Sequence, residues 1–248
     1  IIHLASIAND PCGDLNPKLT WEVSALATMQ IADKAKRLGV KRFIYASSGS
    51  VYGVKEEENV TEDLVLDPIS EYNKTKMVAE RVLLSYQSDM VVQIIRPATV
   101  CGYSPRMRLD VSVNLLTMHA LSKGKITVFG GAQIRPNIHI DDIADLYIHF
   151  INHPEFTGIY NAGFENISIL SIAKMVTKHL PVDIEITESS DPRSYRINSD
   201  KVLATGFKPK KSVENAILEI IENYNSGALK DEEKFHNLKW MQNKDLFN

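Results

Sequence analysis

Residues 41–53 have the sequence KRFIYASSGSVYG, in which an apolar run is followed at once by a crowd of hydroxyl groups. The run 43–46 has the composition of a buried strand, and Ser47, Ser48 and Ser50 come directly after it. Ligands of a parallel sheet bind beyond the carboxyl ends of its strands. The stretch therefore forms either a simple serine-capped turn or a site to which a strand delivers a hydroxyl group. It lacks the G-x-S-x-G order of a hydrolase nucleophile elbow, which argues against a serine hydrolase.

On both sides of this segment, short β-rich runs alternate with segments whose apolar residues recur at the spacing of an α-helix. The β-rich runs are IIHLA (1–5), RFIYA (42–46), VVQIIR (91–96), KITVF (125–129), GIYNA (158–162) and VDIEIT (182–187). The helical stretches are 20–38, 72–87, 109–123, 141–152, 168–180 and 212–226. This alternation predicts a parallel, doubly wound α/β sheet. The predicted helix caps are Ser168, Ser212 and the pair Asp141 and Asp142 at N-termini, and Gly39 at a C-terminus.

The composition excludes several classes of protein. The 248 residues carry a net charge of −3 and no basic patch, which argues against nucleic acid or a membrane surface as a partner. Cys12 and Cys101 form no CxxC or Cys/His cluster. We therefore expect a reduced, cytoplasmic protein without a disulfide scaffold or a metal site. No apolar run approaches the ~20 residues that would cross a bilayer.

A second chemical signal lies in SEYNKTKMVAERVL, residues 70–83. Tyr72 and Lys76 are four residues apart, so a helix places them on one face. An ammonium group held near a phenol favours the phenolate and lowers its pKa from the usual ~10. Such a pair also arises by chance in many helices. In combination with a serine at the end of the preceding strand, it predicts an acid/base device.

These segments together resemble the extended short-chain dehydrogenase/reductase family, in particular its NAD-dependent nucleotide-sugar epimerases and dehydratases. The matching segments are IIHLAS (1–6), KRFIYASSGSVYG (41–53), SEYNKTK (70–76), IIRPATVCG (94–102), NIHIDDIADLY (137–147) and DPRSYRINSDK (191–201). The resemblance implies a partial Rossmann-type sheet with a smaller C-terminal substrate-binding lobe. The NAD-binding part would comprise residues 1–104, with 137–163 returning to it, and residues 105–248 would form mainly the substrate lobe and a polar tail.

The resemblance also implies roles for single residues. The catalytic residues would be Ser48, Tyr72 and Lys76, with the Tyr72 phenolate as the base for a sugar hydroxyl. The residues implied to bind NAD are Leu4, Ala5, Ser6, Ser47, Tyr72, Lys76, Pro97, Thr99 and Val100. The residues implied to bind a nucleotide-diphosphate sugar are Ser48, Gly49, Ser50, Asn114, Thr127, Phe129, Arg135 and Arg193. The alternative for both arginines is a solvated surface charge, and for Asn114 an ordinary place in a helix.

Departures from the family pattern bear on the reaction. Family dehydratases carry an Asp-Glu pair directly after the catalytic hydroxyl, and decarboxylases carry a Glu at the second of these positions. Here Gly49 and Ser50 stand there. We therefore expect C4 epimerisation by oxidation and re-reduction, with 4-dehydrogenation or dehydration as alternatives. SPRMRLD (104–110) adds two arginines, as in a subgroup acting on nucleotide-activated sugars that include heptoses.

One motif of the family is absent. The glycine-rich turn that receives the NAD pyrophosphate has no counterpart in residues 1–248. We therefore expect a fragment or a natural truncation that lacks on the order of 60–80 residues, about two βαβ-scale units. An alternative of another class is a non-catalytic remnant that binds a nucleotide sugar or a partner. A homodimer formed through 20–38 and 72–87 is an expectation from the family.

Overall fold

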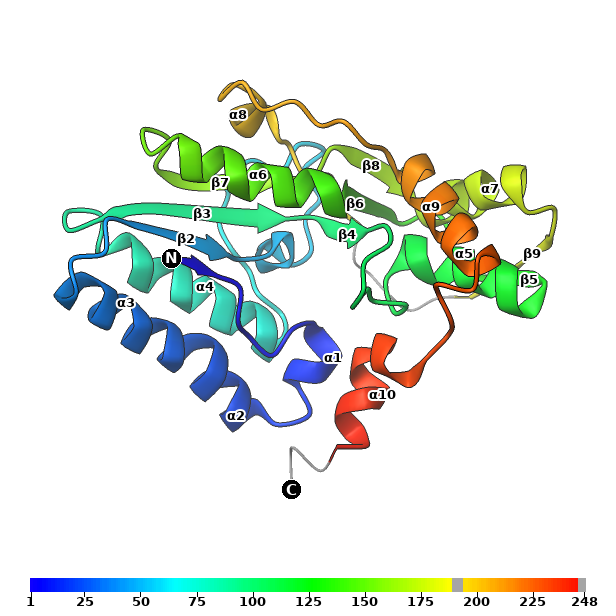
Figure 1. The fold of residues 1–248 in the computed structure, drawn as a ribbon, viewed down its shortest axis with the longest axis horizontal. Coiled ribbons are helices and arrows are strands. Elements are labelled where there is room, and N and C mark those ends of the chain that lie inside the picture. The colour runs from blue at the N-terminus through cyan, green and yellow to red at the C-terminus, as the bar shows by residue number, and fades with distance from the viewer. Residues whose placement is uncertain (189–193, 245–248) are drawn as a thin grey trace.

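The computed structural model describes residues 1–188 and 194–244. Its main sheet has four parallel strands in the order β1, β2, β3, β7 (Figure 1). These strands are β1 (Ile2–His3), β2 (Arg42–Ala46), β3 (Val91–Pro97) and β7 (Gly158–Ala162). The register pairs Ile44 with Gln93 and Ile94 with Ile159. The predicted parallel α/β sheet is thus confirmed, with β1 shorter than the predicted run 1–5.

The chain also forms two smaller sheets and a series of helices. The remaining strands are β4 (Thr99–Cys101), β5 (Lys125–Phe129), β6 (Ile134–His139), β8 (Glu165–Ser168) and β9 (Asp183–Thr187). The α-helices are α1 (Asp10–Gly13), α2 (Pro17–Trp21), α3 (Ala27–Arg37), α4 (Glu71–Leu84), α5 (Ser112–Lys123), α6 (Ile140–Asn152), α7 (Ile169–His179), α8 (Asp200–Leu203), α9 (Val213–Asn225) and α10 (Asn237–Gln242). A π-helical turn, Glu22–Leu26, joins α2 to α3.

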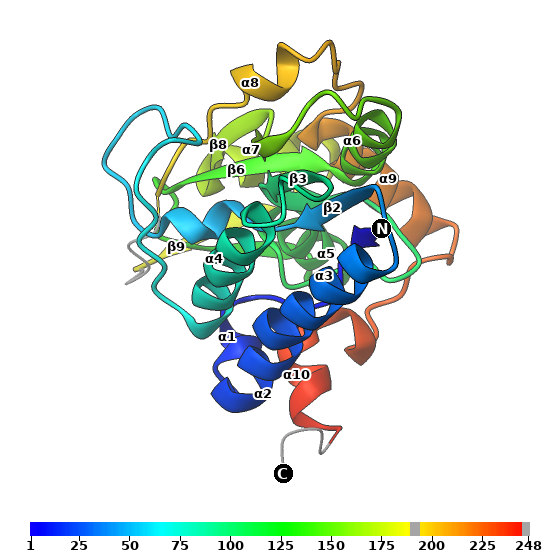
Figure 2. The same cartoon turned by 90° about the vertical axis from the view of Figure 1, so that its left-hand side faces the viewer.

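Helices cover both faces of the main sheet because neighbouring side chains of its strands alternate. Phe43 and Tyr45 belong to one apolar cluster with residues of α3 and α4, whereas Ile44 belongs to another with residues of α6. Figures 1 and 2 show α3 and α4 together beneath the sheet and α6 above it. Both faces are therefore withdrawn from water, which explains why the strands are nearly all apolar.

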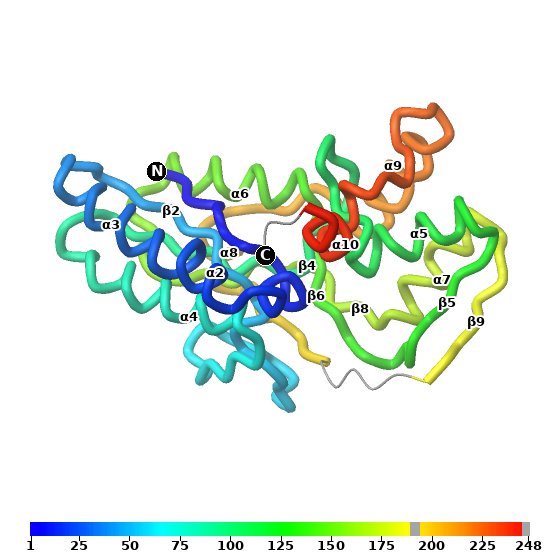
Figure 3. Tube along the Cα trace, turned by 90° about the horizontal axis from the view of Figure 1, so that it is seen from below, coloured from blue at the N-terminus to red at the C-terminus, as the bar shows by residue number. Residues whose placement is uncertain are grey.

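The C-terminal half contributes a core of its own. Strands β5 and β9 pair in parallel, with Ile126 opposite Ile184, while β6 lies between parallel β4 and antiparallel β8. Fully buried Val113, Val176 and Ile217, from α5, α7 and α9, pack against this region. Figure 3 shows these elements gathered at the end of the molecule away from α3 and α4. The proposed boundary near residue 104 stays a prediction.

Two of the predicted helix N-caps are confirmed and the third is wrong. Ser168 and Ser212 cap α7 and α9 as predicted. The prediction that Asp141 and Asp142 cap α6 is wrong, because the His139 side chain accepts the Asp141 N–H instead. Asp142 is buried and accepts the backbone N–H groups of Lys210 and Lys211 at 2.8 and 3.1 Å. It ties the segment before α9 to α6.

Within the described ranges, no helix combines the length and the apolar composition needed to cross a membrane.

A buried ion pair links α4 to the middle of the main sheet. Arg96 of β3 donates to both carboxylate oxygens of Glu80, at 2.9 Å from Nε and 2.7 Å from Nη2. The side chains are 2% and 1% exposed. Ser47 donates to the same carboxylate, and Arg96 Nη1 donates to Tyr52 Oη at 2.7 Å. Tyr52 in turn donates to Asn161 of β7 at 2.8 Å, so one network joins three strands to α4.

Substitution of Arg96 by Met should lower the free energy of unfolding by about 3–5 kcal/mol, because it leaves the Glu80 carboxylate buried without a counter-charge. Urea denaturation measures the change. As a control, Asp33→Asn breaks the exposed pair with Arg37, which is worth at most about 1 kcal/mol. Equal losses in the two variants would contradict the central role of the buried pair.

Candidate active site

A cavity of about 560 Å³ opens at the carboxyl ends of β2 and β3. One wall carries the predicted catalytic and cofactor-binding residues Ser48, Tyr72, Pro97, Thr99 and Val100, together with Ser50. The other wall carries the predicted substrate-binding residues Thr127, Phe129 and Arg135. Residues as far apart in the sequence as Asn9 and Tyr195 therefore meet in one cavity, where a parallel sheet places its ligand site.

The turn after β2 presents Ser48 to this cavity. The strand ends at Ala46, and Ser48 caps a short 3-10 turn, Gly49–Tyr52. Its Oγ accepts the Ser50 N–H at 3.2 Å and lies 2.7 Å from Ser50 Oγ. Ser50 in turn donates its hydroxyl proton to Asn73 Oδ1 at 2.5 Å. The two hydroxyl groups are thus held by local bonds at the end of a rigid strand.

Helix α4 places Lys76 behind Tyr72. Its Nζ donates to the carbonyl oxygen of Ala46 at 2.7 Å and lies 5.8 Å from the centre of the Tyr72 ring. Nζ also lies 4.8 Å from the centre of the Tyr45 ring. Burial lowers the pKa of Lys76 to about 8, against the opposing effect of Glu80. This amine therefore loses its proton at a lower pH than a surface lysine does.

The pKa of Tyr72 differs from expectation. Burial raises it above its usual value, and the nearby Asp10 raises it further. The Ser48 hydroxyl and the Arg108 charge oppose this rise. The expected net lowering is therefore not found in this structure. Tyr72 needs additional positive charge beside its ring to act as a base near neutral pH.

Several predicted site residues have other contacts. Ser47 also lines the cavity, but it is largely buried and its hydroxyl donates to Glu80. Gly49 packs so closely on Ile197 that an added Cβ would come within 2.4 Å of its Cδ1. Asn114 Oδ1 accepts the Gly102 N–H at 3.0 Å, and its Nδ2 donates to the carbonyl of Arg108 at 2.8 Å. Both polar atoms therefore hold the loop after β4, and a substrate-binding role of Asn114 stays a prediction.

Four other predicted residues lie away from the cavity wall or outside the described ranges. Leu4 and Ala5 are exposed and Ser6 is partly buried at the end of β1, the edge strand. Arg193 lies outside the described residues.

The cavity also has lining residues to which the sequence analysis gave no role. Asn73, Arg108 and Tyr195 are among them. Asn73 directly follows Tyr72 in SEYNKTK. Because adjacent residues of a helix point in different directions, the sequence did not indicate that both belong to the site. Only the turn after β2, which brings Ser50 back over α4, makes it part of the site.

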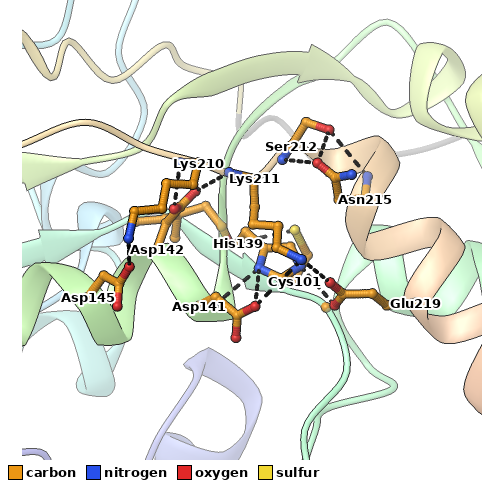
Figure 4. Close-up of polar contacts among 12 residues, drawn as sticks. Cys101, His139, Asp141, Asp142, Asp145, Lys210, Lys211, Ser212, Asn215 and Glu219 are labelled. Atoms are coloured by element: carbon orange, nitrogen blue, oxygen red, sulfur yellow. Dashed lines mark hydrogen bonds and ion pairs between the residues drawn. The ribbon is translucent and has the colours of Figure 1, made fainter.

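A second polar cluster lies outside the cavity wall, around His139 (Figure 4). His139 Nε2 lies 3.0 Å from Glu219 Oε2, and Asp141 is close enough to complete a metal-ligand set. However, the Lys211 ammonium lies 2.8 Å from Glu219 and 3.8 Å from Asp141. Because this cation already balances the carboxylates, we interpret the cluster as an ion-pair junction between α9 and α6. His139 itself is buried within this junction.

The lowered pKa of Lys76 makes a prediction about stability. Between about 8 and 10.5 the unfolded chain holds a proton that the folded protein has lost, so folding stability should rise with pH across this window. The rise should be about 3 kcal/mol. Urea titrations at several pH values measure it, and Lys76→Met should flatten it. An equally steep rise in that variant would assign the effect to other groups.

Comparison with known proteins gives related enzymes. The chain is 25% identical over 238 residues to a UDP-glucose 4-epimerase of Lactobacillus helveticus, covering 85% of this chain and 72% of the relative. It is 26% identical over 238 residues to UDP-glucuronic acid decarboxylase 1 of Danio rerio, covering 90% and 56%. It spans 57%, 40% and 48% of the length of three further curated relatives.

The fold has matching solved structures. That of the UDP-glucuronic acid 4-epimerase from Bacillus cereus, in complex with UDP-glucuronic acid and NAD, superimposes with a TM-score of 0.79 at 25% identity. The match covers 91% of this chain and 75% of the other. Residues 1–163 match the sequence profile of the NAD dependent epimerase/dehydratase family, which is well over half of the chain. The chain belongs to the NAD dependent epimerase/dehydratase family.

Proposed function

We propose that this chain forms the catalytic and substrate-binding part of an NAD-dependent nucleotide-sugar 4-epimerase. The observation that carries the proposal is the shared cavity, in which Ser48 and Tyr72 face Thr127, Phe129 and Arg135. The relatives named as 4-epimerases of UDP-sugars add support.

The residues beside Tyr72 fit the nicotinamide end of NAD. A lysine ammonium has three N–H donors, and Lys76 gives one of them to Ala46. The others suit ribose hydroxyl groups, while Pro97, Thr99 and Val100 supply the adjoining cavity wall. When bound, NAD supplies the hydride acceptor and donor that interconvert a sugar alcohol and a ketone. These residues would therefore hold and orient the cofactor beside the acid/base group.

Side chains of the protein would move the proton of the sugar hydroxyl group. Tyr72 Oη accepts the proton of the C4 hydroxyl group, and the Ser48 hydroxyl hydrogen-bonds the same sugar oxygen. Tyr72 returns the proton when the keto-sugar is reduced. The oxidised nicotinamide carries a positive charge, and such a charge lowers the pKa of an adjacent phenol. This charge would offset the burial that raises the pKa of Tyr72.

The opposite wall suits a nucleotide diphosphate. The Arg135 guanidinium offers planar, charged donors that match phosphate oxygens, and its Nη1 also donates to the carbonyl of Ile134 at 3.2 Å. Phe129 exposes 61% of its surface, which offers an apolar face to a nucleoside. Thr127, on the same strand β5 as Phe129, adds a hydroxyl group. We assign this wall to the nucleotide half of the substrate.

The carboxylates of the cavity favour epimerisation over elimination. Gly49 and Ser50 provide no acid after Ser48. Among the described lining residues, the two carboxylates are Asp10 and Asp110, and both are engaged. Asp10 accepts the Ser70 hydroxyl at 2.6 Å, whereas Asp110 accepts Arg108 Nε at 2.8 Å and the Asn237 N–H at 3.2 Å. Neither is placed to protonate a leaving hydroxyl group without giving up these bonds.

Substitution of Tyr72 by Phe should reduce turnover by about 10²–10⁴-fold, because it removes the group that moves the proton. Nucleotide-sugar affinity should stay nearly unchanged, since the ring remains. Turnover with a panel of nucleotide hexoses and NAD, and calorimetry for binding, measure the two effects. Ser48→Ala should be milder because it deletes a hydrogen bond but keeps the base. Near-normal turnover of Tyr72→Phe would exclude Tyr72 from the reaction.

The type of reaction has a separate test. Incubation with NAD and nucleotide hexoses should give the C4 epimer without a change in mass. Mass spectrometry and sugar analysis of the product distinguish the outcomes. A loss of 18 Da, the mass of water, would establish a dehydratase, and a stoichiometric 4-keto product with reduced cofactor would establish a 4-dehydrogenase. Binding without any product would support the non-catalytic alternative.

A further inference from the structure

Ser48, Ser50 and Asn73 form a directional chain of hydrogen bonds. Ser50 has a single hydroxyl proton, and it donates this proton to Asn73 Oδ1 at 2.5 Å. Ser50 Oγ can then only accept in its contact with Ser48 Oγ at 2.7 Å. Ser48 must therefore be the donor in that contact. The chain therefore runs from Ser48 to Ser50 to Asn73, because each serine has only one hydroxyl proton to donate.

This direction limits what Ser48 can offer. Its Oγ already accepts the Ser50 N–H at 3.2 Å, and its proton points to Ser50 Oγ. The remaining lone pair is all that Ser48 presents to Tyr72. A phenolate needs a donor, whereas a neutral phenol can donate to a lone pair. The Ser48 hydroxyl can lower the pKa of Tyr72 only when it donates to the phenol oxygen. A chain that turns the Ser48 proton to Ser50 withholds this effect and so favours the protonated form of Tyr72.

We propose that Ser50 and Asn73 are positioning residues that act through Ser48, holding its proton away from Tyr72. Asn73 is 1% exposed, which fixes its amide beneath Ser50. A rotation of that amide by 180° would present Nδ2–H instead of Oδ1, so Ser50 would donate to Ser48. Ser48 would then donate outward, to Tyr72 or to a sugar oxygen. The amide of Asn73 thus sets the direction of the whole chain.

Other groups around Tyr72 are independent of this chain. The charged and titratable side chains that act on it or on its neighbours come from several elements: Asp10 of α1, Arg108 after β4, Lys76 of α4, Tyr45 of β2 and Tyr147 of α6. Neither Ser50 nor Asn73 carries a charge. Neutral substitutions of the two residues therefore leave the electrostatic surroundings of Tyr72 in place.

The inference rests on the proposed function only for its consequence in catalysis. If Tyr72 takes a proton from a sugar, Ser48 must turn its proton from Ser50 to the sugar oxygen as the substrate enters. The arrival of that oxygen then lowers the pKa of Tyr72, and the phenol proton leaves to solvent through the cavity that Tyr72 lines. The chain keeps Tyr72 a phenol until a competing acceptor draws the Ser48 proton away.

The test measures the ionisation of Tyr72 directly, without turnover. Protein labelled with ¹³Cζ-tyrosine is examined by NMR at a fixed pH of about 10, where a tyrosine with a raised pKa is mostly neutral. The Tyr72 signal is the one that disappears in Tyr72→Phe. Ser50→Ala frees the Ser48 proton, so the phenolate-to-phenol ratio should rise about tenfold. Ser50→Thr keeps the hydroxyl group and should leave the ratio at the unsubstituted value.

A double-mutant cycle tests the route of the effect. Asn73→Ala should raise the ratio as Ser50→Ala does, and the double variant should match Ser50→Ala alone, because Asn73 acts only through Ser50. An unchanged ratio in Ser50→Ala, or an effect of Asn73→Ala that persists in the Ser50→Ala protein, would overturn the proposal. If Asn73→Ala does not fold, the comparison of Ser50→Ala with Ser50→Thr decides. Failure to find epimerase activity would leave this result intact.

Discussion

The candidate site depends on the buried ion pair between Glu80 and Arg96. Glu80 lies on the same face of α4 as Tyr72 and Lys76, two turns and one turn further along the helix. The two-point contact with Arg96 fixes how far α4 is rotated and how close it lies to β3. Ser47 binds the same carboxylate, so the end of β2 is held relative to this helix face. One carboxylate therefore aligns the serine turn with the tyrosine.

The same ion pair affects the electrostatics of the site. Burial lowers the pKa of Lys76, and the nearby Glu80 carboxylate opposes this effect without cancelling it. Because Arg96 contacts both oxygens of this carboxylate, Glu80 is committed to the sheet rather than to the lysine. Lys76 rests on a carbonyl and two aromatic rings. A lysine held in this way responds readily to any further charge beside it.

The sequence predicted the sheet and several residues that line the cavity, but not the finer contacts. Alternating apolar runs and the Tyr72–Lys76 spacing are local signals, and the structure brings Tyr72 and Ser48 to one cavity. The strands β4, β6 and β8 were missed, since segments of three to six residues carry little period-two pattern and β6 also contains Pro136 and Asn137. The role of Asn114 depends on the loop that it holds, and that of Asn73 on a turn distant in sequence. No local pattern contains such information.

The parallel pairing of β5 with β9 bears on how the chain is made. These strands are separated by residues 130–182, and within that interval β7 joins the main sheet beside β3. In chain order, β5 of the C-terminal core therefore comes first, the last strand of the main sheet comes next, and the partner strand of β5 comes after both. During synthesis, the apolar face of β5 must await β9 and α9 after most of the chain has left the ribosome. The main sheet can therefore be complete before the C-terminal core is, and a nascent chain exposes the apolar residues of that core for longer.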